Sequence, residues 1–199
     1  MRIIFIRHGE TETNVKRKTH FTGDDIGLTA KGIRQIEQTL SVLRGNKIEK
    51  VYCSPEKRAE QSARIIVDGL HLSLEILDGL KERNWGNWNG KPWNEIKNKL
   101  DKMCLEERYN FIPPQGESWK QMEERLKNDL KTITSGKEKC VCIVTHAGVL
   151  RGLMPILKNE ELSISLKYDF ENGSVTLFDY EYGKFKEIVV NDISHCKSI

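Results

Sequence analysis

The sequence has no long hydrophobic run and little net charge. Near the N-terminus, the apolar run "RIIFI" (residues 2–6) is interrupted by Arg7, so it is too short for a signal peptide or a membrane-spanning helix. The formal net charge of +3 is too small to indicate binding to nucleic acid or to a membrane surface. We therefore expect a cytoplasmic protein that binds neither nucleic acid nor a membrane. A local cluster of positive charge is still compatible with this net charge.

The sequence also lacks the cysteine pattern of a metal site or a disulfide framework. Its five cysteines are an odd number, and no CxxC pair occurs among them. Cys140 and Cys142 are two residues apart in "KCVCIVTH", so on a strand they would face the same side. We expect free thiols in a reducing cytoplasm.

Segments typical of strands alternate with segments typical of helices along the chain. Its 199 residues, with no internal repeat, predict a single domain over 1–199. The predicted strands are residues 2–6, 50–54, 74–77 and 140–145, followed by the pair "SVTLFDY" and "KFKEIVV" with a turn at 181–183. Helices are expected after Thr29, from Ser54-Pro55, near 93–103, after Ser118 and after His146. The alternation predicts a three-layer α/β/α fold with a mainly parallel central sheet and an antiparallel edge strand.

Arginines and histidines follow three of the predicted strands, close to the point where each strand ends. Arg7 and His8 end the first strand, Arg58 opens the helix after the second, and His146 ends the central strand. Because the carboxyl ends of parallel strands form the ligand crevice, these side chains should converge. Arginine forks and helix N-termini both suit a phosphate group. No GxxxxGK[ST] loop and no serine or cysteine elbow is present, so histidine is the remaining nucleophile candidate.

Four motifs at these positions resemble the histidine phosphatase superfamily, the phosphoglycerate-mutase-like clan. They are "RHGETETN" (7–14), "SPEKRAEQSA" (54–63), "LKERNWGNWNG" (80–90) and "THAGVLR" (145–151), in the family's order. The resemblance covers nearly the whole chain. It implies catalysis through a phosphohistidine, with no metal and no cofactor, on a small phosphorylated metabolite.

The resemblance also implies roles for the catalytic residues. His8 matches the histidine that is phosphorylated, with a tautomer fixed by a backbone carbonyl such as that of Gly9. His146 matches the second histidine, which binds the phosphoryl group. Glu82 matches the carboxylic acid that protonates the leaving oxygen, although Glu75 and Asp78 lie nearby.

The remaining motif positions correspond to substrate-binding residues of the family. Arg7 and Arg58 match the arginines that grip the phosphoryl oxygens, and Asn14 matches a polar residue of the phosphate pocket. Thr22 lies in the loop "HFTG", which resembles the family's pocket edge and would touch substrate.

Within this family, the sequence favours a phosphatase over a mutase. The region between Glu82 and His146 lacks the long mutase insertion with its paired arginines, and the mutase's extended C-terminal tail is missing. The first substrate candidate is α-ribazole 5'-phosphate. A phosphoglycerate mutase, a phosphoserine phosphatase, a metallohydrolase and a catalytically silent phosphate-binding regulator are the alternatives. We expect a monomer or a homodimer.

Two further features have both a structural and a functional interpretation, and a third is expected to be structural. Trp85, Trp88 and Trp93 either pack in the core or line a substrate pocket. The run at 16–18 is expected to be a solvated face that can steer an anion. Arg151 is expected to be a structural ion-pair partner.

Overall fold

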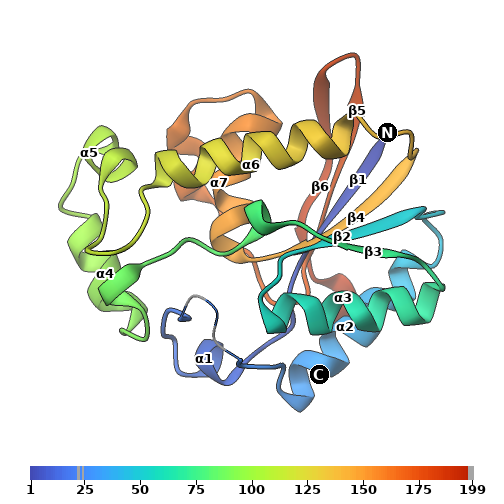
Figure 1. Ribbon diagram of the computed structural model, residues 1–199, viewed down its shortest axis with the longest axis horizontal. Coiled ribbons are helices and arrows are strands. Elements are labelled where there is room, and N and C mark those ends of the chain that lie inside the picture. Colours follow the sequence, from blue (N-terminus) through green and yellow to red (C-terminus); the bar gives the residue numbers. More distant parts are fainter. Residues whose placement is uncertain (22, 24, 197–199) are drawn as a thin grey trace.

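The computed structural model describes residues 1–21, 23 and 25–196 and contains one six-stranded sheet (Figure 1). The strand order is β3-β2-β4-β1-β5-β6. The strands are β1 (Arg2–Arg7), β2 (Lys50–Cys53), β3 (Leu74–Ile76), β4 (Cys140–Thr145), β5 (Val175–Glu181) and β6 (Lys184–Asp192). The first four strands pair in parallel, whereas β5 is antiparallel to both β1 and β6. The predicted α/β sheet is therefore confirmed, with an antiparallel edge formed by a strand pair.

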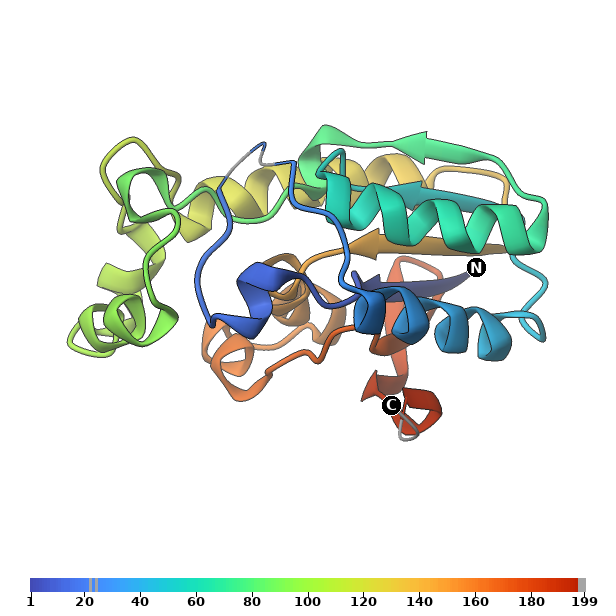
Figure 2. The ribbon, with the colours of Figure 1, turned by 90° about the horizontal axis from the view of Figure 1, so that it is seen from below.

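Helices cover both faces of this sheet, as the three-layer prediction required. In Figure 1, α6 (Trp119–Thr134) and α7 (Ala147–Lys158) lie on one side, and α2 (Ala30–Leu43) and α3 (Lys57–Leu70) lie on the other. The short α1 (Glu12–Val15), together with α4 (Trp93–Leu100) and α5 (Leu105–Asn110), lies beyond the carboxyl ends of the parallel strands. Figure 2 shows α2 and α3 side by side along the sheet.

Two hydrophobic clusters on opposite faces explain why the central strands are apolar throughout. Ile3 and Phe5 of β1 pack into the cluster that contains α6 and α7, while Ile4 and Ile6 pack into the cluster that contains α2 and α3. Because successive strand residues face opposite sides, a strand covered on both faces reads as a continuous apolar run. Cys140 and Cys142 share one cluster, as their spacing predicted, and all five cysteines are free.

Side-chain capping fixes the starts of α2 and α6. The Thr29 hydroxyl accepts a hydrogen bond from the backbone N–H of Gly32 at 3.0 Å, and the Ser118 hydroxyl accepts one from that of Gln121 at 3.0 Å. Each bond satisfies one of the backbone donors that a helix start leaves free, so both predicted caps are confirmed.

The predicted helix start at Ser54-Pro55 is wrong. Helix α3 begins at Lys57 with Glu56 as its N-cap residue. The reason is that Ser54 still pairs with the sheet, through its N–H and the carbonyl of Val144 at 3.1 Å, so the helix can begin only afterwards. The helix α5 was not predicted. It is capped by the Glu107 carboxylate, which accepts from the backbone N–H of Cys104 at 2.9 Å.

Across residues 1–21, 23 and 25–196, no helix combines the length and the apolar character needed to cross a membrane.

Candidate active site

The ends of β1 and β4 bring two histidines together. Arg7 is the last residue of β1, and the backbone N–H of His8 then donates to the carbonyl of Thr145, at the end of β4, at 2.9 Å. The imidazole rings of His8 and His146 consequently lie edge to face, with 5.1 Å between their centroids. The predicted convergence of strand ends is present in the structure.

The tautomer of His8 is set by its own neighbour in the chain. Nδ1 of His8 lies 2.7 Å from the carbonyl oxygen of Gly9. A carbonyl oxygen only accepts, so Nδ1 carries the proton and Nε2 keeps its lone pair. Burial lowers the pKa of His8 well below its ordinary value, and the charges of His146, Arg58 and Arg7 lower it further. His8 is therefore a neutral imidazole with a lone pair on Nε2.

Arg7 and His146 both keep a polar atom without a protein partner beside His8. Arg7 donates from Nη1 to the carbonyl of Phe170, but its Nε is buried and has no hydrogen-bond partner among the described residues. Nδ1 of His146 is likewise buried without a partner in the described part of the chain. Buried polar atoms of this kind are rare in proteins because each costs free energy, so they indicate a place for a ligand.

Arg58 is fully buried behind these groups, next to a glutamate that the sequence analysis did not single out. Its Nη2 lies 3.0 Å from Oε1 of Glu56, and Oε2 of Glu56 lies 2.8 Å from Nε2 of His146. The hydroxyl of Ser54 also lies 2.8 Å from that same nitrogen. The glutamate is visible in the motif "SPEKRA", but only the packing of β2 against β4 brings it to His146.

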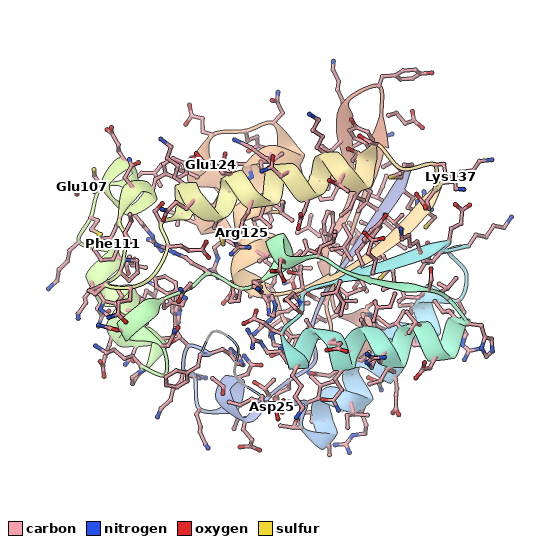
Figure 3. All side chains as sticks on the ribbon, in the orientation of Figure 1. Asp25, Glu107, Phe111, Glu124, Arg125 and Lys137 are labelled. Carbon is pink, nitrogen blue, oxygen red and sulfur yellow. The ribbon has the colours of Figure 1, made fainter. Side chains whose placement is uncertain are left out.

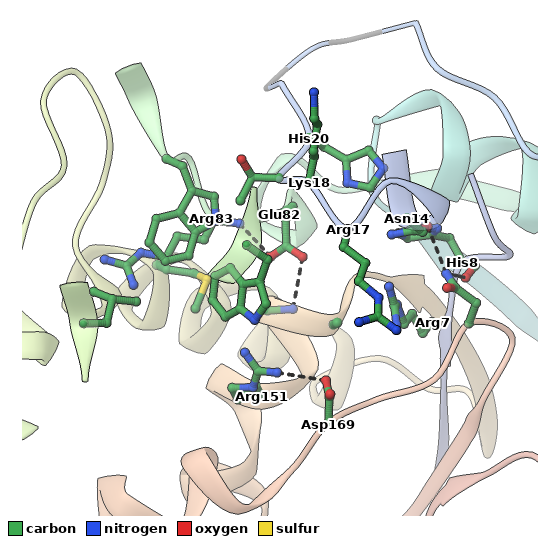
Figure 4. A pocket seen from close by; sticks show the side chains of 18 of the residues that line it. Arg7, His8, Asn14, Arg17, Lys18, His20, Glu82, Arg83, Arg151 and Asp169 are labelled. Atoms are coloured by element: carbon green, nitrogen blue, oxygen red, sulfur yellow. Dashed lines mark hydrogen bonds and ion pairs between the residues drawn. The ribbon is translucent and has the colours of Figure 1, made fainter. Parts of the chain in front are cut away.

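Glu82 is anchored at the N-terminus of α7. Its carboxylate accepts from the backbone N–H of Arg83 at 2.8 Å and from that of Gly148 at 3.0 Å. Arg125 reaches from α6 to the segment that carries Glu82 (Figure 3), where it donates to the carbonyl of Lys81 at 2.8 Å. Together these contacts hold the carboxylate at the cavity wall, where Figure 4 shows it across from His8.

Asn14 lies on the His8 side of the cavity (Figure 4). Its side-chain oxygen accepts from the backbone N–H and the hydroxyl of Thr11, at 3.1 Å and 3.0 Å, and from the side-chain amide of Asn172 at 3.2 Å. Thr22, the other predicted substrate contact, lies outside the described residues. Asn172 was not predicted because no motif marks it.

His20 is a third histidine at the site, and the sequence analysis assigned it no role. Its ring meets that of His8 edge to face at 5.7 Å. Nε2 of His20 lies 2.9 Å from the Thr11 hydroxyl, which also lies 3.0 Å from the side-chain oxygen of Asn14. Burial and the charges of Arg58 and His146 lower the pKa of His20 to about 2. This histidine is therefore neutral.

The site opens into a cavity of about 520 Å³, much larger than a phosphoryl group needs. Aromatic side chains line its far end, namely Trp85, Trp93 and Trp119. Trp88 instead packs on Trp85 and Phe111. Of the three tryptophans with two interpretations, Trp85 and Trp93 therefore line the cavity, and Trp88 has a packing role. Cationic side chains at the wall are Arg17, Lys18, Arg83, Arg108 and Arg151.

Four of those cations bear on the sequence-based interpretation. The run at 16–18 is exposed, as expected of a solvated face, and Arg17 and Lys18 also line the cavity. Arg151 forms the expected ion pair, at 3.1 Å to Asp169, and also lines the cavity. Arg83 was missed: it is buried, donates to two backbone carbonyls and stacks over Trp85 at 4.3 Å.

The described residues contain no group of three or more His, Cys, Asp or Glu side chains arranged to hold a metal ion.

Comparisons with known proteins agree with this geometry. The model of the histidine phosphatase superfamily (branch 1) matches residues 3–193. The chain is 31% identical over 185 residues to a 2,3-bisphosphoglycerate-dependent phosphoglycerate mutase of Thermoplasma acidophilum, covering 91% of this chain and 88% of that protein. It is 27% identical over 185 residues to the adenosylcobalamin/alpha-ribazole phosphatase of Salmonella typhimurium, covering 90% of each.

A solved structure gives the same result. YhfR of Bacillus stearothermophilus superposes with a TM-score of 0.86 at 27% identity, over 98% of both chains. The chain therefore belongs to the histidine phosphatase superfamily, a family of phosphatases and mutases.

Proposed function

We propose that this protein is a metal-independent phosphomonoesterase in which His8 is transiently phosphorylated. One observation carries the proposal: the free Nε2 of His8 lies beside buried nitrogens of Arg7 and His146 that have no partner among the described residues. An anion of phosphoryl size would supply the missing acceptors.

In the first step, the lone pair on Nε2 of His8 attacks phosphorus while the bond to the ester oxygen breaks. Arg7, Arg58 and His146 stabilise the charge on the transferring oxygens, which is the largest demand of phosphoryl transfer. Glu82, in its protonated form, gives its proton to the departing oxygen. General acid catalysis of this kind contributes on the order of 10²–10⁴-fold.

In the second step, water attacks the phosphorus of the phosphohistidine and the phosphorus–nitrogen bond breaks. The Glu82 carboxylate accepts a proton from that water, so the acid is regenerated as inorganic phosphate leaves. Asn14 and Asn172 lie where they would orient phosphoryl oxygens.

A phosphoglycerate mutase is the second candidate. It is favoured by the relative of T. acidophilum, which bears that name and is similar in length to this chain. Because of that similarity, the absence of a long insertion between Glu82 and His146 does not by itself separate the two activities. The product formed in water distinguishes the two activities. A phosphatase releases inorganic phosphate from its substrate, whereas a mutase transfers the phosphoryl group to a second hydroxyl.

The substrate we propose is a small phosphorylated metabolite, with α-ribazole 5'-phosphate as the first candidate. The named phosphatase of S. typhimurium supports this choice. So does the cavity, because the indole rings of Trp85 and Trp93 lie where a flat heterocycle of the leaving group would pack.

The test uses purified protein with EDTA and p-nitrophenyl phosphate, followed by a panel that includes α-ribazole 5'-phosphate, 3-phosphoglycerate, phosphoserine and sugar phosphates. We expect phosphate release and an acid-labile phosphoenzyme, both abolished by His8→Ala. The variant His71→Asn, in an exposed residue away from the site, is the matched control. Full activity in His8→Ala would rule out the phosphohistidine route, and absence of any turnover with intact phosphate binding would point to a regulator.

A further inference from the structure

Glu56 is a buried carboxylate that joins three parts of the candidate site. Only 4% of the residue is exposed. Oε1 pairs with Nη2 of Arg58 at 3.0 Å, whereas Oε2 lies 2.8 Å from Nε2 of His146 and accepts from the backbone N–H of Glu82 at 2.7 Å. None of the roles that the motifs imply belongs to this residue.

A buried carboxylate is expensive unless its neighbours compensate for the lost water. Burial by itself would raise the pKa of Glu56, but the charges and hydrogen bonds of His146, Arg58 and the Glu82 backbone lower it below its ordinary value. Glu56 is therefore ionised and carries a fixed negative charge beneath the phosphoryl-binding groups.

The two groups that face Nε2 of His146 do not act alike. The Ser54 hydroxyl at 2.8 Å can either donate or accept, so it leaves the position of the ring proton open. An ionised carboxylate only accepts, so Glu56 requires a proton on Nε2. In a neutral ring the other nitrogen, Nδ1, would then present a lone pair, and only the doubly protonated ring has an N–H at Nδ1 as well.

Nδ1 of His146 is the nitrogen left for a ligand, since it is buried and has no hydrogen-bond partner in the described chain. A lone pair there would repel a phosphoryl oxygen, and an N–H would bind it. We infer that Glu56 is a positioning residue that fixes a proton on Nε2 of His146 and balances the charge of the doubly protonated ring, so that Nδ1 donates to the phosphoryl group. This inference rests on the proposed function.

Other charged or titratable groups also surround His146. Arg58 shares the Glu56 carboxylate, His8 lies 5.1 Å away between ring centroids, and His20 stands behind His8. The Glu82 carboxylate accepts from Gly148, two residues beyond His146. Among the described residues, Glu56 is the one carboxylate recorded in contact with the ring itself. Because Glu56 also binds Arg58 and the backbone of Glu82, the pH dependence of a variant, rather than the size of its loss, reports on His146.

The experiment compares Glu56→Gln, which keeps the shape and removes the charge, with Glu56→Asp, which keeps the charge. Glu123→Gln is the matched control, because Glu123 is a buried glutamate with a tyrosine donor and a lysine partner on the outer side of the fold. The kcat and KM for p-nitrophenyl phosphate are measured from pH 5 to 9, with circular dichroism to verify folding.

We expect Glu56→Gln to lower kcat/KM on the order of 10- to 100-fold at pH 8, since an ionic hydrogen bond is lost. The loss should shrink toward pH 5.5, where the solvent supplies the proton, so the alkaline limb of the profile moves to lower pH. Glu56→Asp should recover part of the loss, and Glu123→Gln should stay within about twofold of wild type. A loss equal at every pH, or an unchanged profile, would overturn the inference.

A second measurement needs no variant. The ¹⁵N signals of His146 are recorded in the wild-type protein saturated with inorganic phosphate at pH 7, and assigned with His146→Gln. Protons on both ring nitrogens are the expected result, and an unprotonated Nε2 would refute the role of Glu56 even if Glu56→Gln does not fold. A wild type that binds phosphate in this way but hydrolyses nothing would refute the proposed function instead.

Discussion

Nδ1 of His8 lies 2.7 Å from the carbonyl oxygen of Gly9, its immediate neighbour in the chain. The contact depends on the turn that follows β1, which Gly9 can make only because it has no side chain: a Cβ at this position would lie 2.3 Å from the carbonyl oxygen of Gly32. The carbonyl of Gly9 thus fixes the proton on Nδ1 of His8, the proposed nucleophile. Gly32 of α2, which also has no side chain, leaves space for the backbone of the loop at Glu10.

The protonation state of His8 leads to the first prediction. Burial lowers its pKa well below 6.5, so the ¹⁵N signals of its ring should show a proton on Nδ1 and should not change between pH 8 and pH 5. The same ring in the urea-unfolded chain is the control and should titrate at about 6.5. A native His8 that titrates near that value would contradict the buried neutral imidazole.

Glu82 gives the second prediction, which concerns the leaving group. Glu82→Gln keeps the size of the side chain and one of the two oxygens that accept from the backbone N–H groups of Arg83 and Gly148, but it cannot donate an acidic proton. The kcat/KM for an alkyl phosphate, which reports the steps up to departure of the leaving group, should fall by roughly 10²–10⁴-fold because the leaving oxygen needs that proton. The kcat/KM for p-nitrophenyl phosphate should fall much less, since p-nitrophenolate leaves without protonation. Equal losses for both substrates would argue against Glu82 as the acid.

The third prediction concerns acid stability and follows from His20. Its native pKa of about 2 lies below the ordinary 6.5, so below pH 6.5 the unfolded chain binds a proton that the native state does not. The free energy of unfolding should therefore fall as the pH falls from about 6.5, and His20 should contribute up to about 1.4 kcal/mol per pH unit.

Urea denaturation of the wild type and of His20→Gln at several pH values measures this contribution. The variant should lose less stability between pH 6.5 and pH 5, while the two proteins should run in parallel above pH 7.5. Identical slopes below pH 6.5 would show that His20 takes up its proton without unfolding.

The fourth prediction tests the close approach of α2 to the loop after β1. A Cβ on Gly32 would lie 2.2 Å from the carbonyl oxygen of Glu10, so one backbone must shift in Gly32→Ala. Overpacking of this kind destabilises by about 1–3 kcal/mol, and here it should also lower kcat because His8 sits at the other end of the loop. Gly45→Ala is the control, since no described atom lies within 4 Å of its Cβ position. A fully stable and active Gly32→Ala would refute this account.

The sequence predicted most of the fold because the relevant signals are local. The apolar runs of β1 and β4 need both faces covered by other elements, and Thr29 and Ser118 cap α2 and α6. It was wrong at Ser54-Pro55, where pairing with Val144 of β4 keeps the chain extended. A cap signal is local, but the hydrogen bond that overrides it comes from a distant strand.

The site was predictable to the same extent and for the same reason. Arg7, His8 and His146 occupy strand ends, and a parallel sheet brings strand ends together. Side chains without such a rule were missed. Glu56 and Asn172 reach the site through contacts between segments far apart in the chain, and His20 reaches it through the loop that follows α1.

The sequence by itself determined the order of strands and helices, the motifs and the residues at the strand ends, because periodicity, capping and spacing act over a few residues. Only the tertiary structure decided which nitrogen of His146 is free and which charges face one another. Those properties depend on distances between atoms of different segments, such as the 2.8 Å from Glu56 to His146, and on the burial that makes each unpaired charge costly.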